Sequence, residues 1–123
     1  MRTVLVADDE LGTLLLLELL LDEAGYRVVT AGNGRQALEL AGSERPDLVL
    51  LDWMMPVMDG AAALASFRRD PALARIPVVV MSGAAEATLR RHLDGHAGFL
   101  QKPFLERDVL AVVERVLRGT ERE

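Results

Sequence analysis

Short apolar runs alternate with longer amphipathic stretches along the whole chain. Apolar runs of about four to eight residues are typical of strands, whereas apolar positions three and four residues apart are typical of helices. The pattern predicts strands at residues 3–7, 27–31, 47–51, 77–81 and 99–101, and helices at 11–24, 34–41, 60–69, 85–93 and 106–118.

Strict alternation of strand and helix predicts a parallel sheet, because each pair of parallel strands needs a crossover connection. The runs around Val4, Leu48 and Val78 are apolar without interruption, as in central strands covered on both faces. Gly25 is placed as the C-terminal cap of the first helix and Asp59 as the N-cap of the third. We therefore predict a doubly wound α/β fold, which binds ligands beyond the carboxyl ends of its strands.

The length of 123 residues, half of them apolar, is that of one ordinary domain. We expect this domain to cover residues 1–118 and to be followed by a polar tail at 119–123. The chain contains no cysteine, which excludes disulfides and thiolate metal sites. No segment resembles a signal peptide, so we expect a cytoplasmic protein.

The charge pattern argues against two classes of partner. The net charge is −5 and no basic cluster exceeds two adjacent arginines, so we expect no nucleic-acid binding by this domain. The leucine-rich block at 14–21 is interrupted by Glu18 and is much shorter than the ~20 residues of a membrane span, so we expect no membrane contact.

Polar residues collect just past the predicted strands. They are Asp8, Asp9 and Glu10 after the first strand, Gly32, Asn33 and Gly34 after the second, Asp52 after the third, Ser82 after the fourth and Lys102 after the fifth. Each residue alone is equally typical of a helix cap or a turn. Together they indicate a site along one edge of the sheet.

Three carboxylates meet at this edge if the first and third strands are neighbours. Asp8, Asp9 and Asp52 then require a cation, because they cannot all stay charged in one cleft without one. Mg²⁺ prefers oxygen ligands of this kind, with Mn²⁺ as an alternative. A carboxylate beside such a metal is a nucleophile for phosphoryl groups, which makes Asp52 the candidate acceptor.

Lys102 and Ser82 suit the remaining needs of phosphoryl transfer, which depends mainly on positioning and on neutralising charge. An ammonium and a hydroxyl supply both to the phosphoryl oxygens. Lys102 is the only lysine among 14 basic residues, which favours a site that uses a compact point charge.

With these residues in view, the sequence resembles the receiver domain of bacterial response regulators over essentially its whole length. The matching segments are VLVADDE (4–10), GYRVVTAGNGRQAL (25–38), PDLVLLDWMMPVMDG (46–60), IPVVVMSG (76–83) and GFLQKPF (98–104). The resemblance implies a flavodoxin-like five-stranded parallel sheet in the order 2-1-3-4-5, flanked by five helices.

The resemblance also implies a signalling phosphoacceptor, not an enzyme, that assists its own phosphorylation and dephosphorylation. Asp52 would be phosphorylated by a sensor histidine kinase or a histidine phosphotransfer protein. Asp9, Asp52 and the backbone carbonyl of Met54 would bind Mg²⁺, with Asp8 acting through water.

The resemblance further assigns the conformational response. Ser82 and Lys102 would contact the phosphoryl oxygens, and Phe99 would be the switch aromatic that turns inward when Ser82 moves. Plain core packing is the alternative for Phe99. The bond between Lys102 and Pro103 is expected to be cis.

Three features depart from the family pattern or are left unexplained by it. The segment from Ser82 to Phe99 is about two residues short, which predicts a shortened fourth helix. Met54 and Ala84 are apolar at positions that tune hydrolysis, so we expect a long-lived phosphoryl group. Leu15 and Leu19 are expected to be exposed, either as scattered surface leucines or as a docking or dimer surface, since the family's phosphodonors dock on this helix.

Three rival functions stay open at this point. Residues 32–37 match the glycine pattern of nucleotide-binding modules, although the match is isolated. An aspartate-nucleophile phosphohydrolase would need a second acid where Met54 stands. A degenerate receiver acting only as a scaffold is disfavoured, because every acceptor-site residue is present.

Overall fold

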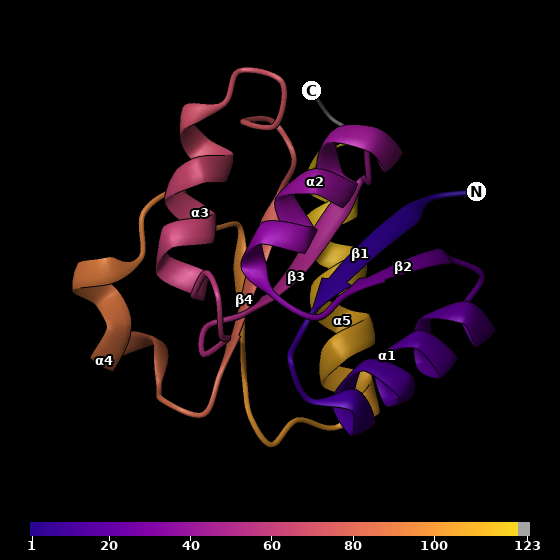
Figure 1. Cartoon of the computed structure of the whole chain (residues 1–123). Coiled ribbons are helices and arrows are strands. Elements are labelled where there is room, and N and C mark those ends of the chain that lie inside the picture. Colours follow the sequence, from indigo (N-terminus) through magenta and orange to yellow (C-terminus); the bar gives the residue numbers. More distant parts are fainter. Residues whose placement is uncertain (121–123) are drawn as a thin grey trace.

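A computed structural model describes residues 1–120 as a parallel sheet between two layers of helices (Figure 1). The strands are β1 (Thr3–Ala7), β2 (Arg27–Ala31), β3 (Leu48–Asp52), β4 (Val78–Ser82) and β5 (Gly98–Gln101). The helices are α1 (Leu11–Glu23), α2 (Gly34–Glu44), α3 (Gly60–Arg69), α4 (Glu86–Leu89) and α5 (Glu106–Thr120), with a 3₁₀ turn at Arg90–His92. The strand order is β2-β1-β3-β4-β5, which confirms the predicted topology.

Alternation along the strands divides the core into two layers, because successive side chains point to opposite faces of a sheet. Val4 and Val6 of β1 pack against α1 and α5 on one face. Leu5 and Ala7 pack against α2 and α3 on the other. Figure 1 shows these helix pairs on opposite sides of the sheet. The continuous apolar runs of the central strands are thereby explained.

The strand register brings the predicted site residues to one edge. Ala7 of β1 pairs with Leu51 of β3, so the residues after Ala7 lie beside Asp52. Asp52 pairs in turn with Met81, and Ser82 pairs with Gln101, directly before Lys102. Parallel pairing therefore places the carboxyl ends of β1, β3, β4 and β5 side by side.

Most predicted boundaries hold within one residue, and two helices are longer than predicted. The third and fourth strands are each shifted by one residue, so Asp52 and Ser82 are the last residues of their strands. The second helix continues to Glu44, and the fifth to Thr120. Residues 119 and 120, the first two of the expected polar tail, continue α5, and residues 121–123 lie outside the described part. The division into a domain at 1–118 and a tail at 119–123 stays a prediction.

The fourth helix is much shorter than the predicted 85–93. Only one α-helical turn forms, at Glu86–Leu89, before the 3₁₀ turn. Short helices depend on tertiary packing, and this segment offers the core only Leu89 and Leu93. A short α4 agrees with the shortened fourth helix that was predicted from the length of the segment between Ser82 and Phe99.

Two helix ends carry the caps expected from the sequence. The Asp59 carboxylate accepts a hydrogen bond from the Ala62 N–H at 2.8 Å, and Gly25 takes a φ of 97° after α1. Among the described residues, no helix is both long and apolar enough to cross a membrane.

Candidate functional site

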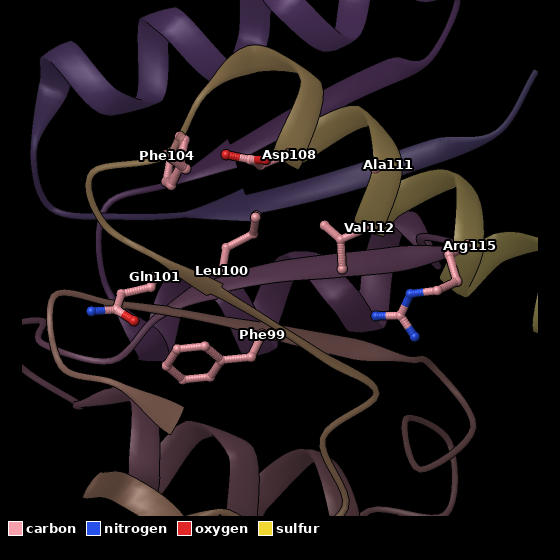
Figure 2. A pocket seen from close by; sticks show the side chains of 8 residues that line it. All are labelled: Phe99, Leu100, Gln101, Phe104, Asp108, Ala111, Val112 and Arg115. Atoms are coloured by element: carbon pink, nitrogen blue, oxygen red, sulfur yellow. The ribbon is translucent and has the colours of Figure 1, made fainter. Parts of the chain in front are cut away.

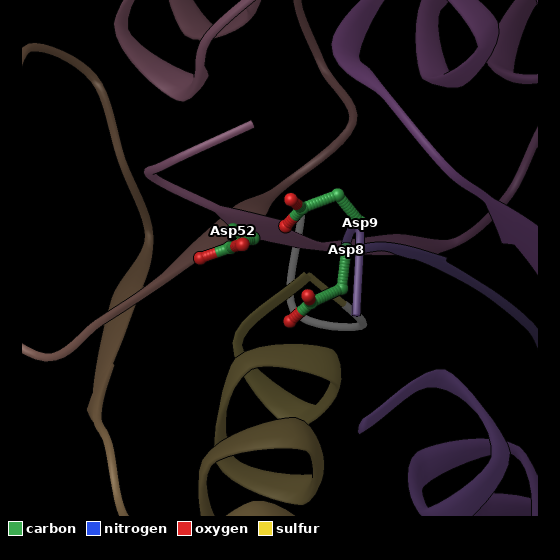
Figure 3. A group of neighbouring side chains, drawn as sticks. All are labelled: Asp8, Asp9 and Asp52. Atoms are coloured by element: carbon green, nitrogen blue, oxygen red, sulfur yellow. The ribbon is translucent and has the colours of Figure 1, made fainter. Parts of the chain in front are cut away.

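Three aspartates form an acidic cluster at the carboxyl edge of the sheet (Figure 3). Asp8 and Asp9 follow β1, and Asp52 ends β3. One carboxylate oxygen of each lies within 4.8 Å of the others. Asp8 and Asp52 are buried, whereas Asp9 is exposed. The cluster is therefore open to solvent on the side of Asp9.

Lys102 lies against two of these carboxylates. Its Nζ donates to Asp8 Oδ2 at 2.8 Å and to Asp52 Oδ1 at 3.3 Å. Burial lowers the pKa of Lys102, but the hydrogen bond to Asp8 and the charges of Asp52 and Asp8 together raise it above its ordinary value. Lys102 is consequently a fixed positive charge at Asp52.

The Asp52 carboxyl is the most perturbed acid of the site. Burial raises its pKa, the negative charge of Asp8 raises it further, and Lys102 opposes both, with a net result of about 6. One ammonium does not balance three carboxylates, so the cluster carries excess negative charge at neutral pH. Three clustered carboxylate oxygens with excess negative charge suit a hard divalent cation such as Mg²⁺.

Asp8 is held from both sides. Its Oδ1 accepts the N–H of Glu10 at 2.9 Å, and its Oδ2 accepts from Lys102. Both oxygens therefore already have a protein partner, which is compatible with the prediction that Asp8 acts through water.

Ser82 is the last residue of β4 and is buried. It follows Met81, the residue that pairs with Asp52. Its Oγ accepts the N–H of Ala84 at 3.0 Å, and its backbone carbonyl accepts the N–H of Lys102 at 2.7 Å. Ser82 and Lys102 are thus tied together through the backbone. The predicted contact of Ser82 with a phosphoryl oxygen stays a prediction.

Met54 follows the acceptor strand in the loop toward α3. Its side chain is 73% exposed, and its N–H lies 3.5 Å from Asp52 Oδ1. The ligand role of its carbonyl stays a prediction, as does the influence of Met54 and half-buried Ala84 on hydrolysis.

Phe99 is half-buried at the second position of β5, where it packs against the core layer of α2 and α3. Phe99 is one of the residues that line a groove of about 450 Å³ between β5 and α5. Figure 2 shows Phe99 and Leu100 on opposite sides of the strand. This position fits both core packing and the predicted switch. The bond between Lys102 and Pro103 is cis, as predicted.

The glycine-rich segment after β2 has a packing explanation. Asn33 caps α2 by accepting the Gln36 N–H at 2.8 Å, and the Gly32 N–H donates to Gln36 Oε1 at 2.7 Å. A Cβ on Gly34 would lie 2.4 Å from the Met58 carbonyl oxygen. These N–H groups have side-chain partners, so the glycine pattern is not by itself a sign of phosphate binding.

Sequence reasoning missed the glycine that shapes the acceptor loop. A Cβ on Gly60 would lie 2.7 Å from the Asp52 carbonyl oxygen and 2.6 Å from Trp53 Cα. The Gly60 N–H also donates to the Trp53 carbonyl at 3.0 Å. Its position after the Asp59 cap was visible, but no one-dimensional pattern shows that two backbone segments approach each other.

Comparisons with known proteins agree on one family. The family model described as "Response regulator receiver domain" matches residues 4–114. The alkaline phosphatase synthesis transcriptional regulatory protein PhoP of Bacillus subtilis is 35% identical over 98% of this chain and 50% of its own length. The phosphate regulon transcriptional regulatory protein PhoB of Pseudomonas aeruginosa is 32% identical over 97% of this chain and 53% of its own. The chain thus spans about half the length of these relatives.

Solved structures give the same result. The chemotaxis protein CheY4 of Vibrio cholerae has a TM-score of 0.89 and 30% identity, covering 94% of this chain and 98% of its own. The receiver domain of the sensor histidine kinase PA1611 of Pseudomonas aeruginosa, with a magnesium ion coordinated in its active-site cleft, has a TM-score of 0.87 and 27% identity. That match covers 94% of this chain and 97% of the PA1611 domain.

Proposed function

Because this chain belongs to the response regulator receiver domain family, we propose that Asp52 accepts a phosphoryl group from a phosphohistidine donor in two-component signalling. The observation that carries the proposal is the geometry around Asp52. This carboxylate is buried, lies within 3.3 Å of the Lys102 ammonium, and shares its cleft with Asp8 and Asp9. One cleft thus contains a nucleophile, an ammonium group and two further carboxylates that suit a metal ion.

The reaction exchanges one bond for another. An Asp52 carboxylate oxygen attacks phosphorus, an O–P bond forms, and the N–P bond to the donor imidazole breaks with the electron pair leaving on nitrogen. Lys102 already lies at Asp52 Oδ1 and binds an oxygen of the incoming phosphoryl group. Ser82, tied to Lys102 through the backbone, donates its hydroxyl to another. The chain thereby assists its own phosphorylation.

Asp8, Asp9, Asp52 and the Met54 carbonyl are the residues that would hold Mg²⁺ or Mn²⁺. When bound, the metal supplies positive charge that offsets the carboxylates and the phosphoryl oxygens. The acidic cluster supports this assignment, and so does the magnesium in the related PA1611 receiver domain.

The proposed partner is a sensor histidine kinase or a histidine phosphotransfer protein. Phosphorylated Asp52 draws Ser82 toward it, and Phe99, which lies on the α2 and α3 side of β5, turns inward into the space that Ser82 leaves. The apolar side chains of Met54 and Ala84 do not position an attacking water, so the phosphoryl group is long-lived. No nucleic acid or membrane is proposed as a partner of this domain, and the cytoplasmic location stays a prediction.

The test is incubation with acetyl phosphate and Mg²⁺, followed by intact mass measurement. We expect a gain of one phosphoryl group in the wild type, no gain in Asp52→Asn, and a normal gain in Asp59→Asn. Asp59 is a matched control because asparagine is an equally good N-cap, so the fold is kept. A wild type without an adduct, or an adduct that persists in Asp52→Asn, would overturn the proposal.

A further inference from the structure

Exposed leucines lie on two different flanks of α1. Leu16 is 50% exposed and faces the loop that carries Lys102 and Pro103. Leu15 and Leu19 are 55% and 58% exposed, which confirms the expected exposure, and they lie on the other flank, toward the edge strand β2. Figure 1 shows α1 running beside β2. The second flank is therefore separate from the loop next to the acceptor site.

A groove of about 470 Å³ runs along this second flank. Its lining residues are Leu15, Glu18, Leu19, Asp22 and Val28, and we refer to it as the α1–β2 groove. The volume lies in the range of about 300–1,000 Å³ that is usual for binding clefts. Three lining residues are apolar and two are acidic.

The apolar character of α1 exceeds what its buried face needs. Leucine occupies positions on every side of the helix, and helices that are apolar all round are normally buried. Leu17 and Leu21 fill the core, yet Leu15 and Leu19 are left in solvent. The sequence thus has the composition of a helix covered on more than one side.

The charges beside these leucines are mutually unfavourable. Glu18 and Asp22 are four residues apart on one helix, where like charges repel. Asp22 and Glu23 also lie in the last turn, where the helix dipole is negative and disfavours acids. The segment from Leu11 to Gly25 contains no basic residue, and within residues 1–120 no ion pair involves Glu18 or Asp22. Cations brought by another molecule would relieve this repulsion.

From this charge complementarity we propose that the α1–β2 groove binds an amphipathic helix of a partner protein that carries leucine-like and basic side chains in adjacent rows. Leu15 with Leu19, and Glu18 with Asp22, form two neighbouring rows of i, i+4 spacing. A partner helix with the same spacing matches both rows, apolar to apolar and basic to acidic.

A second copy of this chain fits the groove less well. Two α1 helices related by a two-fold axis would bring Glu18 and Asp22 against the same acids. The groove also has five lining residues, whereas a stable protein–protein interface has about 20–30 residues on each side. The site is suited to a short helical segment. Binding of such a segment is a function beyond the proposed phosphoryl transfer, and it does not require that transfer.

The test uses two synthetic peptides of about 15 residues, the length at which isolated helices begin to form. Both have leucines in one i, i+4 row, and the neighbouring row carries arginines in one peptide and glutamates in the other. We expect the arginine peptide to bind the wild type with a Kd on the order of 10 μM by fluorescence anisotropy, and the glutamate peptide to bind at least about tenfold more weakly.

Leucine-to-serine variants, which keep the net charge, separate this site from general attraction to an acidic protein, and a charge-reversal variant tests the acidic row. Leu15→Ser with Leu19→Ser should weaken the arginine peptide at least about tenfold, whereas Leu16→Ser, on the other flank, should change its Kd less than about twofold. Glu18→Arg with Asp22→Arg should reverse the preference in favour of the glutamate peptide. Circular dichroism and acetyl phosphate labelling check that each variant is folded.

Three outcomes would overturn the proposal. The first is no binding of the arginine peptide to a wild type that still accepts a phosphoryl group. The second is equal weakening by Leu16→Ser. The third is a wild-type dimer in analytical ultracentrifugation that Leu15→Ser with Leu19→Ser dissociates, because the groove would then belong to a second copy.

Discussion

At the scale of single residues, Val57 has the least favourable backbone near the site. Its φ is 68°, in the left-handed region that β-branched residues avoid. The Met58 N–H donates to the Pro56 carbonyl at 2.7 Å across it, which closes a γ-turn. Its side chain is 76% exposed, so packing offsets little of the strain. The turn is imposed by the loop, since the Met58 carbonyl must also accept the Gly34 N–H.

Val57→Asn should raise the free energy of unfolding by about 1 kcal/mol, because asparagine tolerates the left-handed region. Val57→Gly should gain less, since glycine adds entropy to the unfolded chain. Urea denaturation in EDTA measures both. Met54→Asn, an exposed change in the same loop at ordinary φ, is the control and should bring no gain. A loss of stability in Val57→Asn would show that Val57 is not strained.

At the scale of elements, α3 holds the segments that precede β4 and β5, close to the shortened α4. The Arg68 guanidinium donates to the Ile76 carbonyl at 2.7 Å and to the Gly95 carbonyl at 3.2 Å. Its aliphatic part lies against Gly95, where a Cβ would be 2.7 Å from Arg68 Cδ. The segments that lead into β4 and β5 are thus both anchored on α3. His96 Nε2 lies 2.8 Å from Glu86 Oε2, at hydrogen-bond distance, which adds a link to α4.

Arg68→Met should lower the free energy of unfolding by about 1–3 kcal/mol, because it keeps the aliphatic contact and removes the two hydrogen bonds. Hydrogen exchange should become faster at the Ala97 amide, which is bonded to the Val78 carbonyl. Arg69→Met, at the exposed neighbouring position, is the control and should change stability by less than about 0.5 kcal/mol. Equal effects of the two substitutions would contradict the anchoring role of Arg68.

At the scale of the whole molecule, the acceptor site makes stability depend on pH. The pKa of Asp52 is about 6 in the folded chain against an ordinary value of 3.8, chiefly because of burial and of the charge on Asp8. The folded state therefore binds this proton more tightly than the unfolded state does. The stabilisation is complete below pH 3.8 and is lost as the pH rises through about 6.

Asp52→Asn should accordingly be more stable than the wild type at pH 7.5 in EDTA, by about 1–3 kcal/mol, and the two should converge near pH 4. Denaturant titrations at both pH values measure the difference. Millimolar Mg²⁺ should raise the melting temperature of the wild type more than that of Asp52→Asn, because it offsets the carboxylate charge. If the two proteins differed in free energy of unfolding by the same amount at both pH values, the link to Asp52 ionisation would be refuted.

The amino-acid sequence by itself determined the fold class, the strand order expected from the family, and the residues gathered at the site edge. Periodicity carries this information locally, because side chains alternate along a strand and recur every 3.6 residues along a helix. Asp8, Asp52 and Lys102 were visible as polar residues that end apolar runs. Parallel pairing then required them to meet.

Only the tertiary structure decided the features that depend on contacts between distant segments. These features are the one-turn α4, the strained φ of Val57, the anchoring of Gly95 by Arg68 and the approach of Gly60 to Asp52. The two flanks of α1 also became distinct only when β2 and the Lys102 loop were placed on either side of it. A local pattern does not contain such distances, because they are set by the packing of the whole chain.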